Sequence, residues 1–196
     1  MKIKTESLIL DLIERTRQNI NQVEQLSQLT EKELNKKKNQ VTWSILECIE
    51  HLNLYGEFYI PEIEQKIEQS KTDPDQLFKS GVLGNYFAKS MLPSKKMRKI
   101  KTFKDKNPNG RKLNKRTLKR FLEQQKQILE LLNKSRKINL NKTKTAISIS
   151  KLLKLKLGNT FRVLIYHNQR HIEQAKTQLN KGTIHKVYKN SRLVSN

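Results

Sequence analysis

Apolar residues recur at intervals of three and four in four long stretches of the chain. Spacing of this kind places the apolar side chains along one face of an α-helix, with polar residues on the opposite face. The pattern predicts four helices, at residues 6–28, from residue 44, at residues 114–136, and from residue 151 or 158 to residue 180. Leu, Lys, Gln and Glu, which favour helices, are abundant, so we expect an all-α chain.

The second predicted helix carries the clearest local signals. Ser44 followed by Glu47 has the spacing of a capping box, in which the serine oxygen accepts a free backbone N–H and the glutamate reaches back. Pro61 falls inside the apolar stripe and is expected to kink the helix. His51 borders that stripe, three residues after Cys48. The helix is therefore expected to place a histidine at the edge of the core.

Residues 71–113 interrupt the helical pattern. Proline and glycine breakers are spread through them, while apolar residues between positions 78 and 87 indicate packing on the rest of the protein. We expect a long crossover between the second and third helices, and a connection of this length allows those helices to run parallel. The predicted organisation is a single four-helix domain at residues 1–180 with a tail at residues 181–196.

Length, cysteine content and hydropathy narrow the class of protein. The 196 residues suffice for one domain with a substantial core. The single cysteine, Cys48, excludes an internal disulfide and fits a reducing cytosol. No apolar run has the length of a membrane span, and the N-terminal segment lacks the pattern of a signal peptide. We therefore expect a cytoplasmic protein without a membrane partner.

The formal net charge of +23 is unevenly distributed along the chain. Residues 1–88 carry a net charge of −3, residues 89–156 carry +20, and residues 157–196 carry +6. A basic middle of this kind can attract phosphates, nucleic acid or an anionic substrate. A lysine-coated surface that only keeps the protein soluble accounts for the same composition. Both interpretations remain open at this stage.

A histidine pair near the end of the chain is the strongest chemical signal. His167 and His171 are four residues apart, which places both imidazoles on one face of a helix, one turn apart. His171 takes the place of an apolar residue on the inward face, and burying an imidazole without a partner costs free energy. The pair is therefore either hydrogen-bonded or bound to a ligand. Together with His51 on a second helix, it could hold one metal ion and leave a coordination position open.

Two motifs in this order resemble the DinB-like superfamily. The first runs from Trp43-Ser44 through Glu47 to His51-Leu, and the second is His167-x-x-Arg170-His171-x-x-Gln174. The resemblance covers roughly residues 5–180 and is closest to a branch of metal-dependent hydrolases and thiol transferases. It implies a four-helix bundle with up-down-down-up topology and a long crossover between helices 2 and 3.

The resemblance also implies a divalent metal ion held by His51, His167 and His171. Zinc is the default for three imidazoles, and Ni, Mn, Fe or Co remain alternatives because imidazole ligands do not select sharply. His185 matches no position of the family motif and is expected to lie on the surface.

The metal could support two kinds of chemistry on a small-molecule substrate. An open divalent ion can lower the pKa of water, which gives a hydrolase, or that of a low-molecular-weight thiol, which gives a transferase. The relatives that the resemblance suggests make thiol transfer the favoured reaction. They also make a homodimer the expected oligomer.

Several neighbours of the histidines are candidates for supporting roles. Glu47 and Gln174 could each orient an imidazole or a bound water, with the capping box as the competing role for Glu47. Cys48 is weighed as a fourth ligand against simple packing in the core. Arg170 points either to solvent or to an anion. Tyr55 and Tyr166 line either the pocket or the core.

Two readings without catalysis compete with the enzyme. In the first, the basic residues 89–156 bind nucleic acid or an acidic partner; no recognisable nucleic-acid-binding motif supports it, and stacking aromatics are sparse there. In the second, the bundle keeps its fold, has lost its chemistry and acts as an interaction module. The chain has no phosphate-binding glycine loop, so the enzyme hypothesis rests on the metal alone.

Overall fold

The computed structural model describes residues 1–94, 102–148 and 150–179. These residues form six α-helices, two short 3-10 helices and two two-stranded antiparallel sheets. The long helices are α1 (Thr5–Leu26), α3 (Ile45–Glu68), α5 (Arg116–Lys134) and α6 (Leu157–Lys176). The shorter elements are β1 (Lys2–Lys4), α2 (Glu31–Asn35), β2 (Leu77–Lys79), α4 (Val82–Ser90), η1 (Lys104–Lys106), η2 (Ser135–Lys137), β3 (Lys144–Ile147) and β4 (Ser150–Lys156).

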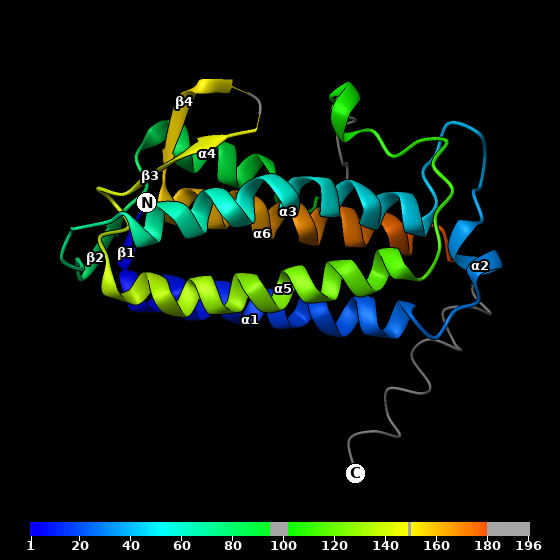
Figure 1. The fold of residues 1–196 in the computed structure, drawn as a ribbon, viewed down its shortest axis with the longest axis horizontal. Helices are drawn as coiled ribbons and strands as arrows, with labels where there is room; N and C mark the ends of the chain where they lie inside the picture. Colours follow the sequence, from blue (N-terminus) through cyan, green and yellow to red (C-terminus); the bar gives the residue numbers. More distant parts are fainter. Residues whose placement is uncertain (95–101, 149, 180–196) are drawn as a thin grey trace, which may run out of the picture.

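The four long helices pack on one another along their lengths. Helix α3 contacts both α5 and α6, and α1 contacts the same two helices from the other side (Figure 1). Their buried apolar side chains form two clusters, one around Leu12 and Phe161 and the other around Ile49 and Phe121. The stripes seen in the sequence therefore face inward, as the helical period requires.

Helix α3 begins as the sequence predicts. The Ser44 oxygen accepts the backbone N–H of Glu47 at 3.2 Å, and the Glu47 carboxylate accepts the backbone N–H of Ser44 at 2.8 Å. This capping box satisfies two N–H groups at a buried helix end. The helix then continues through Pro61, whose ring is exposed, as far as Glu68. One uninterrupted element thus carries both His51 and Tyr55.

The crossover between α3 and α5 packs on the long helices through short elements. Strand β2 pairs antiparallel with β1, so Phe78 lies opposite Ile3. Phe78 is fully buried against the start of α6, where a Cβ at Gly158 would lie 2.6 Å from its ring. Glycine at position 158 therefore permits the close approach of β2 to α6. Helix α4 follows β2 and also packs on α6.

The structure is mostly helical, as predicted, and adds two small antiparallel sheets that the prediction lacked. The alternative start of the fourth helix near residue 158 agrees with α6, but residues 151–156 form strand β4 rather than the beginning of that helix. Leu and Lys alternate from Leu153 to Lys156, and a period of two is the pattern of a strand. Leu155 lies opposite Thr145 in the hairpin, and both side chains are buried.

Among the described residues, no helix combines the length and the apolar character needed to cross a bilayer.

Candidate metal centre

The structure brings the three predicted histidines together. His51 comes from α3, and His167 and His171 come from neighbouring turns of α6. One ligand nitrogen from each lies within 4.8 Å of the other two. The ring centroids are 5.1 Å apart for His51 and His167, and 4.5 Å apart for each of the other two pairs. We call these three residues the histidine cluster.

Hydrogen bonds fix the orientation of two of the imidazoles. The Nδ1–H of His51 donates to the backbone carbonyl of Lys106 in η1 at 2.8 Å. The Nδ1–H of His171 donates to the side-chain oxygen of Gln174 at 2.8 Å. Because a carbonyl oxygen only accepts, both rings carry their proton on Nδ1 and leave the Nε2 lone pair free. This is the arrangement that metal-binding histidines use.

Burial keeps the cluster uncharged. It lowers the pKa of His51 to about 4 and that of His171 to about 3, and it lowers the pKa of His167 well below 6.5. The positive charge of Arg170 lowers the pKa of His167 and His171 further. Neutral imidazoles at pH 7 are ready to donate to a metal, and three of them suit zinc and its neighbours in the first transition row. The residues present therefore fit the ion that the motif implies.

Two aromatic side chains flank the cluster. The Trp43 ring centroid lies 4.8 Å from that of His51 and 6.0 Å from that of His171. The Tyr55 ring lies 4.9 Å from His51 and 4.7 Å from His167. Burial raises the pKa of Tyr55 to about 12, so its hydroxyl keeps its proton at neutral pH. The rings of Trp43 and Tyr55 thus lie beside the histidines.

The remaining predicted neighbours take separate places. Gln174 contacts His171, as predicted, whereas the Glu47 carboxylate serves the capping box and pairs with Lys37 at 2.6 Å. Cys48 is fully buried among apolar side chains, and burial raises the pKa of its thiol. Tyr166 is buried in the other apolar cluster, with the guanidinium of Arg15 5.0 Å from its ring centroid.

Arg170 is 7% exposed and does not point freely into solvent. His185 and residues 95–101 of the basic segment lie outside the described residues.

Sequence reasoning missed the contribution of η1. The carbonyl of Lys106 is a backbone group, so no side-chain motif marks it. Trp43 entered only as part of a motif, yet its ring borders two histidines. Tyr55 is four residues after His51, and this helical spacing was the available signal for its place beside the cluster.

Comparison with models of protein families identifies the family of this chain. The family model of the DinB superfamily, whose members in general bind metals, matches residues 12–175. No curated protein and no solved structure matches the chain. The match covers most of the chain and includes all three members of the histidine cluster. The chain therefore belongs to the DinB superfamily.

Proposed function

We propose that this protein is a divalent-metal-dependent enzyme that acts on a small molecule, either transferring a low-molecular-weight thiol or hydrolysing its substrate. His51, His167 and His171 would hold the ion. The observation that carries the proposal is the convergence of three neutral imidazoles, two of them oriented by Nδ1–H hydrogen bonds. The Nε2 atoms of His51 and His171 are both acceptors and cannot satisfy each other, so a shared electrophile is the partner they fit.

Thiol transfer is the better supported of the two reactions. A divalent ion, when bound, supplies a Lewis acid that favours the ionised form of a thiol or of water. Among the described residues, no carboxylate joins the histidines, and Glu47 is held by Ser44 and Lys37. A thiol has a pKa near 8.5, far below that of water, so its activation needs less help from a general base. Trp43 and Tyr55 supply apolar surface for a small organic reactant.

We also infer a single bundle domain at residues 1–180 with up-down-down-up topology, followed by a tail. Figure 1 supports this: α1 and α6 run from the end of the molecule that holds β1 toward α2, and α3 and α5 run the opposite way. The parallel pair α3 and α5 is separated by the long crossover. The homodimer remains a prediction from the resemblance.

Metal content tests the proposal most directly. Protein purified without a histidine tag or chelator should contain about one transition-metal ion per chain by elemental mass spectrometry. His171→Ala should lose it, while His185→Ala, which removes a histidine that matches no family position, should keep it. A metal-loaded sample would then be screened with small thiols and electrophiles. If no metal binds after reconstitution with zinc, nickel, manganese, iron or cobalt, the proposal of a metal-dependent enzyme is wrong.

A second candidate function is the binding of nucleic acid or an acidic partner without catalysis. A hollow of about 290 Å³ at the end of α3 favours it, because four lysines line the hollow: Lys66, Lys71, Lys142 and Lys144. Oligonucleotide binding that weakens steeply with salt, and that is lost in Lys142→Glu with Lys144→Glu, would support this function. Salt-insensitive or undetectable binding would exclude it.

A further inference from the structure

We propose that Lys106 selects the substrate of the histidine cluster by binding an anionic group, such as a carboxylate, beside the ring of Tyr55. This inference rests on the proposed function and names the substrate class of the same site. It assigns two tasks to one residue of η1: its carbonyl orients His51, and its ammonium recognises charge.

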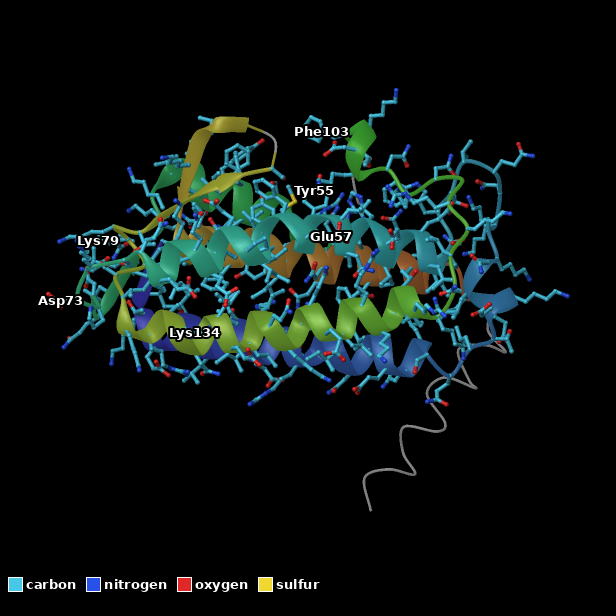
Figure 2. All side chains as sticks on the ribbon, viewed as in Figure 1. Tyr55, Glu57, Asp73, Lys79, Phe103 and Lys134 are labelled. Atoms are coloured by element: carbon cyan, nitrogen blue, oxygen red, sulfur yellow. The ribbon has the colours of Figure 1, made fainter. Side chains whose placement is uncertain are left out.

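The position of Lys106 supports the second task. Its ammonium nitrogen lies 6.0 Å from the centroid of the Tyr55 ring, and that ring lies 4.9 Å from His51 and 4.7 Å from His167. Figure 2 labels Tyr55 and Phe103 on the same side of α3, where η1 stands. The Tyr55 ring is therefore a common neighbour of the cation and of two of the imidazoles. A reactant at the cluster that extends along this ring would reach the cation.

The segment that follows η1 is anchored independently of the Lys106 side chain. Beyond the His51 hydrogen bond, Arg111 donates to the buried carboxylate of Glu50 at 3.0 Å. Lys37 donates to the side chain of Asn109 at 3.2 Å. These contacts hold the segment that follows η1 against the bundle. The lysine side chain can therefore be replaced without removing the carbonyl that orients His51.

Positive charge acts on the imidazoles themselves, whereas the negative charge of Asp105 acts on the neighbouring Tyr55. The three imidazoles are neutral, no carboxylate of the described residues joins them, and the positive charges of Lys106 and Arg170 both act on them. A divalent ion would add to that positive potential. A reactant that carries a negative charge is the one this field attracts.

The present partner of the lysine is weakly held. Lys106 pairs with Asp105 at 3.4 Å, but the Asp105 side chain is 70% exposed, whereas that of Lys106 is 17% exposed. An ion pair of this length with an exposed carboxylate contributes little to stability, so a substrate anion can replace Asp105 at small cost. An ammonium is a point charge without the planar fork of arginine, so we expect selection by charge more than by shape.

Cobalt-loaded protein and two thiol probes test this assignment. Mercaptoacetate carries a carboxylate and 2-mercaptoethanol does not; the affinity of each is measured by titrating the cobalt absorption spectrum. Lys106→Met should weaken mercaptoacetate binding about tenfold, the loss expected for one hydrogen bond to a charged group, and should change 2-mercaptoethanol binding less than about twofold. Lys106→Arg should restore most of the preference.

Two further variants sharpen the test. Lys104→Met removes an exposed lysine from the same 3-10 helix and should leave the ratio of the two affinities unchanged. Asp105→Asn removes the competing carboxylate and should tighten mercaptoacetate binding. Cobalt content is measured for every sample. Bound cobalt with an unchanged ratio in Lys106→Met, or equal losses in Lys104→Met and Lys106→Met, would overturn the assignment alone. Absence of cobalt from the wild type would overturn the proposed function and this assignment together.

Discussion

Helix α6 takes part in two buried polar groups that are built on opposite principles. Near its start, Asn159 and Arg162 meet Ser80 and Asn85 from the crossover; we call these four residues the arginine cluster. Arg162 donates to Ser80 at 2.9 Å, to Asn159 at 3.2 Å and to Asn85 at 3.0 Å. Most donors here therefore meet acceptors, as buried polar groups require, although the Nε–H of Arg162 has no hydrogen-bond partner. Two turns later, the histidine cluster brings acceptor nitrogens together.

The difference separates a structural network from a ligand site. The arginine cluster joins α4 and the end of β2 to α6, and the backbone carbonyl of Ser80 also accepts from the Asn159 amide at 2.8 Å. Nothing further has to bind for most of its hydrogen bonds to be made. The histidine cluster is oriented from outside by Lys106 and Gln174, and its inner nitrogens remain for a ligand. The two clusters therefore differ mainly in whether their donors and acceptors are paired with one another, and less in how deeply they are buried.

The dependence of folding stability on pH should be the largest difference between the two clusters. Metal-free protein should lose stability as the pH falls from 7 to 5, by roughly 2 kcal/mol from His51 alone, with His167 and His171 adding in the same direction. The pKa of His51 is about 4 in the folded chain against 6.5 when unfolded. Below pH 6.5, His51 is therefore protonated in the unfolded chain, whereas in the folded chain it becomes protonated only near pH 4. Urea denaturation of chelator-treated protein measures the change.

The control for this experiment is the double variant His51→Ala with His171→Ala, which should show a shallower dependence on pH. Equal slopes in the variant and the wild type would contradict the assignment of the effect to the cluster.

Loss of the guanidinium should affect stability and spare the metal. Arg162→Ala removes three hydrogen bonds and the contact with the Tyr166 ring, whose centroid is 5.7 Å from the guanidinium carbon. We expect destabilisation of about 2 kcal/mol in urea denaturation, because buried acceptors lose a donor. Metal content should match that of the wild type. A metal-free Arg162→Ala protein that is still folded would break the distinction between the clusters.

Gln174 should affect the metal and spare the fold. Gln174→Ala frees the Nδ1 side of His171, and removal of such an orienting group weakens metal affinity about tenfold. A competitive chelator titration measures the affinity. Glu173→Ala is the matched control, since its carboxylate pairs with Lys176 at 2.7 Å and does not touch the imidazoles. Equal effects of the two substitutions would show that the helix end, and not the amide, is responsible.

Cys48 gives the smallest expected effect. Cys48→Ala should destabilise the protein by about 1 kcal/mol, because a fully buried side chain loses one heavy atom. Metal content should not change, since the thiol lies among apolar side chains. Loss of metal in this variant would indicate that Cys48 is a metal ligand after all.

The long helices and the proximity of His167 to His171 could be predicted because both follow from the period of the helix. The apolar stripes and the i, i+4 spacing of His167 and His171 are local patterns, and the structure places them as expected. Strands β1 and β2 have only three residues each, which is too short for a recognisable period of two. They also pair across more than 70 positions, so no local pattern predicts them. The contact from Lys106 uses a backbone carbonyl, which every residue has. What could not be predicted is where the chain brings distant backbone to the site.

The hydrogen bond between His51 and the Lys106 carbonyl joins positions 55 residues apart. Closing a loop of that length costs conformational entropy that grows with the logarithm of its size. This entropy loss opposes folding, before a ligand arrives, so binding does not have to bring η1 to His51. The site is preorganised, and less of the intrinsic affinity for a ligand is lost to immobilising the chain. Association should accordingly be fast, and calorimetry should find little ordering entropy opposing it.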